Sequence, residues 1–218
     1  MSSLFRLLTT LTLMVMSLST IAQDIKLPDP DKKGGVPLMQ ALNDRASGRE
    51  YDSRKLTEQE LSNLLWAAWG INRPGEGKHT APSSNNKQEM SVYAAMESGL
   101  YLYVPEIHQL KQIHNRDIRK ATGKQDFVGI AAINLIYVAD LKKAGVTNPE
   151  KAGPEVLNTP NINTGFMAQN VYLWCASEKL ACVVRGWVDH AELSKAMELA
   201  PYQRIIITQT VGYPKNQL

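Results

Sequence analysis

The sequence predicts an α+β fold, in which helices and strands alternate irregularly within one domain. The spacing of apolar residues follows a helical period over residues 57–69 and changes to the period of two typical of strands at Met90. A strand, a tight turn and a second strand follow one another there, which indicates antiparallel pairing. The 218 residues contain neither an internal repeat nor a boundary between domains, and they suffice for one sizeable core.

The first 22 residues have the features of a cleaved signal peptide. Arg6 provides a positive charge ahead of an uncharged run, residues 7–21, that is too short and too polar to span a membrane comfortably. Thr20 and Ala22 place small residues on both sides of Ile21, as signal peptidase requires. No cysteine follows the run, so we expect no lipoprotein anchor. The sequence predicts a secreted or periplasmic protein that is free of the membrane after cleavage.

An extended arm, residues 23–36, precedes two predicted helices. The arm is rich in proline, glycine and lysine. Pro37 suits the first turn of a helix that ends near Asp44. Thr57 and Glu60 form a capping-box pattern, which apolar residues at helical spacing follow: Leu61, Leu64, Leu65 and Ala68. Turn-forming residues then predict a loop over residues 72–82.

The centre of the chain predicts the strands of a sheet. Residues 90–96 and 100–104 form the expected hairpin. Residues 130–138 are continuously apolar, which is typical of a strand buried on both faces. A short helix is predicted at residues 116–122. Residues 148–163 contain three prolines without periodicity, so we expect a long loop that serves as a lid or contacts a partner.

The last quarter predicts two helices and two strands. Large apolar side chains cover a broad face of the first helix: Phe166, Met167, Val171, Trp174 and Cys175. A strand at residues 181–188 follows, and Asp189 is expected to cap a helix that contains Leu193 and Met197. Residues 204–211 predict the last strand. The first of these helices carries more apolar surface than one small domain usually buries, and this predicts a homodimer.

Composition argues against several other classes of protein. The net charge of +3 is mild and the lysines and arginines are scattered, so no nucleic-acid binding is predicted. The four histidines lack the spacing of metal ligands, and no metal site is predicted. The two cysteines, Cys175 and Cys182, are expected to be buried, and the sequence leaves open whether they form a disulfide.

Three polar segments stand out as candidate binding elements. The first places Arg45, Ser47 and Arg49 at alternate positions, where extended side chains point the same way. Arginine side chains suit the multi-oxygen geometry of a phosphate, although a solvated loop is the alternative for this triplet alone. The second segment, residues 81–88, offers hydroxyl and amide groups that can meet the alternating donors and acceptors of a flavin's pyrimidine edge: Ser83, Asn86 and Gln88. By composition alone, an ordinary loop is the alternative.

The third segment is the helix that contains Gln169 and Asn170, polar residues that need partners if they are buried, and the strand that ends at Gly186. In this order and spacing, the three segments resemble the nitroreductase superfamily of FMN enzymes. Its R-R-S-x-R motif corresponds to residues 45–49, its A-P-S-x-x-N-x-Q motif to residues 81–88 and its G-x-x-x-Q-N-x-x-L helix to residues 165–173.

The resemblance extends over residues 37–215, and a final G-Y-P occupies residues 212–214. The chain departs from the family pattern in having Ala46 instead of the second arginine, Lys179 instead of glycine, and a short tail after Pro214. The helix at residues 64–70 and the hairpin around residues 101–103 are similar to the thiazoline/oxazoline oxidase branch of the superfamily.

The resemblance implies a nitroreductase-like, FMN-binding domain over residues 37–218, with a mainly antiparallel sheet flanked by helices. It also implies a homodimer in which both chains contribute to each FMN site. The cofactor-binding residues that it implies are Arg45, Ser47 and Arg49 toward the phosphate and ribityl chain, Ser83, Asn86 and Gln88 toward the ring edge, the backbone of Val184, Arg185 and Gly186 near the reactive nitrogen, and Lys215 in place of a longer basic tail.

The function implied is that of an FMN-dependent oxidoreductase, which passes hydride or electrons from a small-molecule donor to a small-molecule acceptor. No catalytic side chain is predicted, because the flavin itself carries out the chemistry. Two alternatives stay open at the level of sequence. One is a flavin-binding carrier or sensor without turnover, and the other is a structural protein that has lost FMN.

Overall fold

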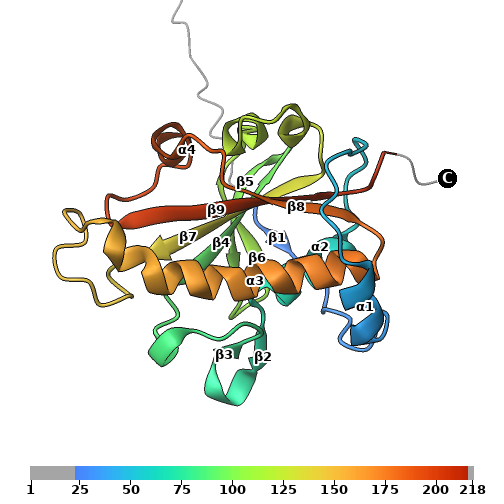
Figure 1. Cartoon of the computed structure of the whole chain (residues 1–218), viewed down its shortest axis with the longest axis horizontal. Coiled ribbons are helices and arrows are strands. Elements are labelled where there is room, and N and C mark those ends of the chain that lie inside the picture. Colours follow the sequence, from blue (N-terminus) through green and yellow to red (C-terminus); the bar gives the residue numbers. More distant parts are fainter. Residues whose placement is uncertain (1–22, 216–218) are drawn as a thin grey trace, which may run out of the picture.

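A seven-stranded sheet in the order β1-β6-β5-β4-β7-β9-β8 forms the centre of the computed structural model (Figure 1), which describes residues 23–215. All six pairings between neighbouring strands are antiparallel. The strands are β1 (Ile25–Lys26), β4 (Met90–Met96), β5 (Gly99–Val104), β6 (Gln109–His114), β7 (Ile133–Asp140), β8 (Ala181–Arg185) and β9 (Gln203–Gly212). This architecture confirms the predicted α+β class. The predicted signal peptide, residues 1–22, lies outside the described residues.

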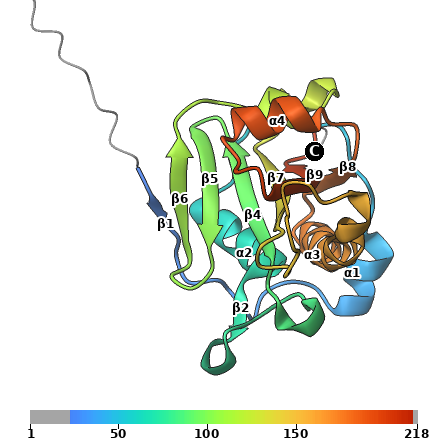
Figure 2. The same cartoon turned by 90° about the vertical axis from the view of Figure 1, so that its left-hand side faces the viewer.

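Helices cover both faces of the sheet (Figure 2). The helices are α1 (Leu38–Asp44), α2 (Glu58–Trp69), α3 (Asn158–Ser177) and α4 (His190–Ala196). Strand β7 faces both layers, because successive side chains of a strand point to opposite sides. Leu135 and Tyr137 pack in the core with residues of α2 and α3, whereas Ile136 and Val138 pack with residues of α4. This double burial explains the uninterrupted apolar sequence.

The beginnings of the helices follow the local signals. Thr57 accepts a hydrogen bond from the Glu60 amide, while the Glu60 carboxylate accepts one from the Thr57 amide, so the predicted capping box is confirmed. Asp189 caps α4 by accepting a bond from the Glu192 amide. The predicted helix before Asp44 is also present, with Pro37 at its N-cap.

The expectation of a loop over residues 148–163 is wrong at its C-terminal end. A 3-10 turn (Pro154–Leu157) leads directly into α3 at Asn158. Pro160 lies in the first turn of α3, where a helix does not require its missing amide hydrogen. The 20-residue helix therefore extends further toward the N-terminus than its apolar pattern suggested.

Several strand boundaries also differ from the prediction. Strand β8 ends at Arg185 instead of residue 188, because the Val188 amide bonds back to the Gly186 carbonyl and turns the chain out of the sheet. Strand β7 begins three residues later than expected and extends to Asp140. The helix predicted at residues 116–122 is a 3-10 turn (Arg119–Thr122), and the loop at 72–82 contains strand β3 (Lys78–His79), which pairs with β2 (Ile71–Arg73).

Strand β6 has no counterpart in the sequence predictions. It pairs with β5 on one side and with the short β1 on the other, so the arm at residues 23–36 begins as a strand at the edge of the sheet. Both cysteines are buried, as expected, and both are free thiols. Across residues 23–215, no helix combines the length and apolarity needed to cross a membrane.

Candidate functional site

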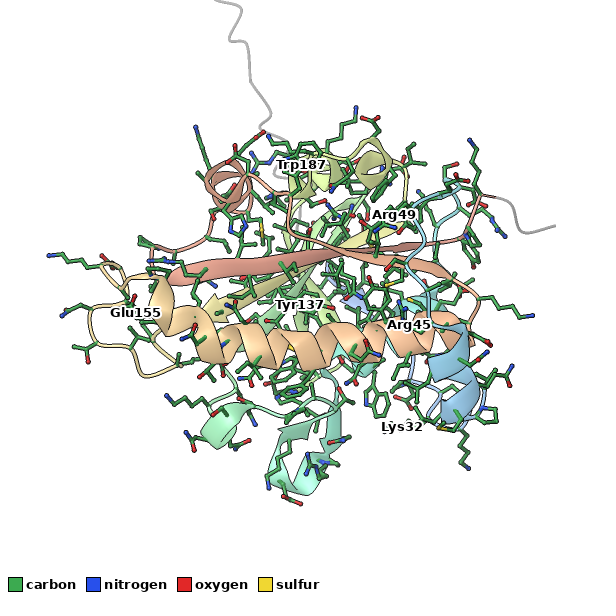
Figure 3. The ribbon with its side chains drawn as sticks, in the orientation of Figure 1. Lys32, Arg45, Arg49, Tyr137, Glu155 and Trp187 are labelled. Carbon is green, nitrogen blue, oxygen red and sulfur yellow. The ribbon has the colours of Figure 1, made fainter. Side chains whose placement is uncertain are left out.

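The first candidate segment, residues 45–49, leaves α1 and runs beside the free edge of β8. The Gly48 amide donates to the Cys182 carbonyl at 3.0 Å. A Cβ atom on Gly48 would lie 2.9 Å from the Ala181 Cβ, so a larger residue would force the two segments apart. This glycine therefore allows the arginine-containing segment to lie directly against the sheet. Figure 3 shows Arg45 beside the C-terminal part of α3 and Arg49 nearer to β8.

Tyr172 of α3 connects this segment to β8. Its hydroxyl accepts a hydrogen bond from the Val184 amide at 2.9 Å and lies 3.1 Å from the Ser47 hydroxyl. The guanidinium of Arg45 lies 5.5 Å from the centre of the Tyr172 ring. The structure thus brings Arg45, Ser47 and Val184 together around one side chain. Tyr172 was not among the predicted site residues, although it lies in the third candidate segment, two residues after Asn170.

A hollow of about 410 Å³ lies between these elements. Its walls come from the start of the 45–49 segment, the end of α3, the turn into β8 and the C-terminal residues: Asp44, Ala46, Gly48, Tyr172, Cys175, Ala176, Lys179, Leu180, Ala181 and Pro214. Lys215 lies close by, because its amide donates to the Glu50 carbonyl at 3.2 Å. This bond places Lys215 beside the segment that carries Arg45 and Arg49. Arg49 and Lys215 are exposed, and Arg45 is half-buried.

The second candidate segment is held in a strained conformation. Asn86 and Gln88 have φ angles of 53° and 50°, in the left-handed region that non-glycine residues adopt at a cost. Internal hydrogen bonds fix this shape. The Ser83 hydroxyl accepts from the Gln88 amide and donates to Glu89, while the Gln88 side chain donates to the Gly77 carbonyl and to Asn86. Asn86 is the exposed member of the predicted trio.

These two segments attach to different parts of α3. The first contacts Tyr172, whereas the second is linked to Asn163, which donates to the buried Glu89 carboxylate at 2.6 Å. Nine residues separate Asn163 from Tyr172. This separation corresponds to about 13.5 Å and about two and a half turns of helix, so the two side chains leave opposite faces. The structure of one chain therefore does not bring Asn86 and Gln88 together with Arg45 and Ser47.

The third candidate segment ends β8. Val184 is half-buried and Gly186 is exposed, with no atom within 4 Å of the position that a Gly186 Cβ would occupy. The side chain of Arg185 points into the protein, donating to Thr122 and Asn134, and only 4% of the residue is exposed. This desolvation lowers the pKa of Arg185 to about 10, which leaves it charged at neutral pH.

The chemistry of these groups fits FMN. Two arginines and a serine hydroxyl at alternate positions of one segment suit a phosphate, and the open backbone at Gly186 permits the close approach of a flat ring. Asn86 presents an exposed amide that can both donate and accept. Within residues 23–215, no three or more histidine, cysteine or acidic side chains form a cluster that could hold a metal ion.

Comparisons with known proteins agree with the fold and with these motifs. The nitroreductase family model matches residues 42–213. A protein of Methanocaldococcus jannaschii that is provisionally named a nitroreductase is 30% identical over 194 residues, which cover 84% of this chain and 94% of the relative. The chain belongs to the nitroreductase family.

Solved structures show the same relationship. A provisionally assigned nitroreductase of Ralstonia eutropha has a TM-score of 0.81 and 40% sequence identity, with 89% of this chain and 90% of the other covered. The NADPH:FMN oxidoreductase of Vibrio harveyi, solved with NAD+, has a TM-score of 0.61 and 19% identity, with 82% and 69% covered. At that identity, the second likeness concerns the fold alone.

Proposed function

We propose that this protein is an exported FMN-dependent oxidoreductase that passes electrons between two small molecules. The observation that carries the proposal is the cluster of Arg45, Ser47 and Val184 around the side chain of Tyr172. Bound FMN supplies the two-electron chemistry, and the protein supplies binding, orientation and electrostatics. Membership of the nitroreductase family supports this assignment.

In this proposal each segment has a distinct task. Arg45, Arg49 and the Ser47 hydroxyl hold the phosphate and ribityl chain, and Lys215 adds a cation from the C-terminal end. The open backbone from Val184 to Gly186 lies against the ring. The rigid segment with Ser83, Asn86 and Gln88 faces the ring edge, and its internal hydrogen bonds fix the orientation of that edge in advance.

The same proposal requires a homodimer, because one chain keeps the Asn86 segment apart from the Arg45 segment. An exposed apolar strip on α3 supports such an interface, with Ile162 61% and Phe166 44% exposed. Leu38 and Met39 of α1, which packs against α3, are exposed as well. Exposed apolar surface of this kind is typical of subunit contacts. A second chain would then complete each binding site.

Export and the oxidase-like branch are further parts of the proposal. Export rests on the sequence of residues 1–22, and the branch rests on the helix at residues 64–70 and the hairpin around residues 101–103. N-terminal sequencing of the protein recovered outside the cytoplasm should begin at Gln23. An N-terminus at Met1 in that fraction would argue against cleavage.

The central experiment is to identify the cofactor of the purified mature protein. We expect FMN, and not FAD, by mass analysis of the released molecule, together with a rise in melting temperature on addition of FMN. NADH, NADPH and small thiols should then be tested as reductants of the bound flavin. Reduction followed by reoxidation with an acceptor supports an enzyme. Bound FMN that none of them reduces supports the carrier or sensor instead, and a protein that stays colourless with added FMN contradicts the proposal.

A further inference from the structure

Arg185 is a buried cation without an anionic partner. Its guanidinium donates to the Thr122 carbonyl at 2.8 Å and to the Asn134 side-chain oxygen at 3.0 Å, and it has a longer contact of 3.4 Å with the Thr122 hydroxyl. All of these acceptors are neutral. Among residues 23–215, no carboxylate forms an ion pair with it. Burying a charge in this way is costly, so its presence requires an explanation.

The fold does not need the guanidinium to satisfy its acceptors. The Thr122 carbonyl also accepts a hydrogen bond from the Thr208 hydroxyl, and the Asn134 oxygen also accepts one from the Thr210 hydroxyl at 2.6 Å. Both acceptors would therefore keep a donor if Arg185 were replaced by an apolar residue of similar length. Replacing a buried charge in this way is often neutral for stability.

The position of Arg185 suggests another use for the charge. The residue lies at the end of β8, between Val184, whose amide is bonded to Tyr172, and the exposed Gly186. A ring that contacts the backbone of residues 184–186 would be about one side-chain length from the guanidinium. The charge acts through a low-dielectric interior, where salt screens it little.

We infer that Arg185 is the fixed positive charge that stabilises the reduced form of the bound flavin and raises its reduction potential. This inference rests on the proposed function. At neutral pH, reduction of FMN adds two electrons and one proton, so the ring gains one negative charge. A nearby cation favours that charge and leaves the binding of oxidised FMN almost unchanged.

The direct test is Arg185→Met in the full mature chain, with oxidised and reduced FMN titrated separately. We expect the dissociation constant of reduced FMN to rise about tenfold and that of oxidised FMN to change less than about threefold. A tenfold difference corresponds to a potential lower by about 30 mV for a two-electron couple. Redox titration of the bound flavin against a reference dye measures this shift independently of turnover.

A second variant neutralises the same charge while keeping the arginine. Asn134→Asp places a carboxylate at the atom that already accepts from Arg185, although it loses the bond from the Asn134 amide to the Val128 carbonyl. We expect Asn134→Asp to lower the reduction potential of the bound flavin, as Arg185→Met does. The matched control is Thr210→Val, which removes a neutral hydrogen bond from the same network and should lower the melting temperature without changing the potential.

The outcomes separate this inference from the proposed function. Wild-type protein that binds no FMN overturns both. Wild-type protein that binds FMN, together with Arg185→Met and Asn134→Asp variants that keep the wild-type potential, overturns the role of Arg185 alone. A shift in Thr210→Val as large as in the other two would also overturn it, because the effect would then come from packing and not from charge.

Discussion

At the scale of single residues, Tyr172 determines how the candidate site is held together. Its hydroxyl accepts a hydrogen bond from the Val184 amide of β8 and also forms one with the Ser47 hydroxyl of a separate loop. A phenylalanine would fill the same volume and leave both groups without this partner. The side chain therefore links α3, β8 and the 45–49 segment through one oxygen atom.

We predict that Tyr172→Phe weakens FMN binding by about fivefold and lowers the free energy of unfolding by about 1 kcal/mol, since the half-buried Val184 amide loses its acceptor. Flavin titration and thermal melting measure the two effects. Tyr202→Phe is the matched control, because Tyr202 lies on the far end of the molecule, where its ring contacts Lys142. Equal losses of affinity in both variants would contradict the role given to Tyr172.

A second residue-scale prediction compares two cations. Arg45→Ala should weaken FMN binding by about 2 kcal/mol, or roughly thirtyfold, because a half-buried arginine that packs on Tyr172 can form charge-assisted bonds to phosphate. Lys215→Ala should cost less than about fivefold, because the lysine side chain is exposed close to the C-terminus. If Lys215→Ala has the larger effect, the short tail performs the task that we assign to Arg45.

At the scale of elements, α2 shows how a local motif fixes the start of a helix. Two reciprocal hydrogen bonds between Thr57 and Glu60 satisfy amides that the first turn would otherwise expose. The Glu60 carboxylate also accepts a bond from Tyr213 at 2.7 Å, so this helix end is tied to the C-terminal residues.

We therefore predict that Thr57→Ala destabilises the protein by about 1 kcal/mol and lowers its melting temperature by roughly 2–4 °C. Thr57→Ser keeps the hydroxyl and should restore most of the loss. Differential scanning calorimetry of the two variants provides the comparison. A serine variant as unstable as the alanine variant would mean that the methyl group, and not the cap, stabilises α2.

Helix α3 combines three tasks along its length. Met167 and Val171 are fully buried against the sheet, Tyr172 organises the candidate site, and Ile162 and Phe166 remain exposed. An apolar helix that is only partly covered by its own domain is expected to contact another surface. The exposed residues of α3 therefore connect the structure of this helix with the proposed homodimer.

At the scale of the whole molecule, we predict that Phe166→Glu, alone or with Ile162→Glu, converts a homodimer into monomers and abolishes tight FMN binding. The charge would be buried in an apolar contact, and each site would lose the segment contributed by the other chain. Light scattering after size exclusion, at micromolar concentration and with FMN present, measures the mass. Ile107→Glu is the control, since Ile107 is as exposed (60%) as Ile162 (61%) but lies in the turn between β5 and β6. Wild-type protein that is monomeric under these conditions would contradict the prediction.

Local chemistry in the sequence determined the elements whose signals lie within a few residues. The capping box at Thr57, the hairpin of β4 and β5, and the doubly buried strand β7 each depend on spacing along the chain. The polar segments were recognised in the same way, because their side chains match a phosphate and a ring edge whatever their surroundings. Strand β6 was not predicted, because its mostly half-buried side chains show no clear alternation of apolar and polar residues. It forms a strand through its pairing with β5.

Only the tertiary structure decided which of these segments meet. It brought Arg45 and Ser47 to Val184 through Tyr172, directed the Arg185 side chain into the interior, and kept the Asn86 segment elsewhere on α3. Such outcomes depend on contacts between residues far apart in the chain, such as the bond that joins Arg185 to Thr122. A sequence pattern records what a residue can bind, whereas packing determines what lies within its reach.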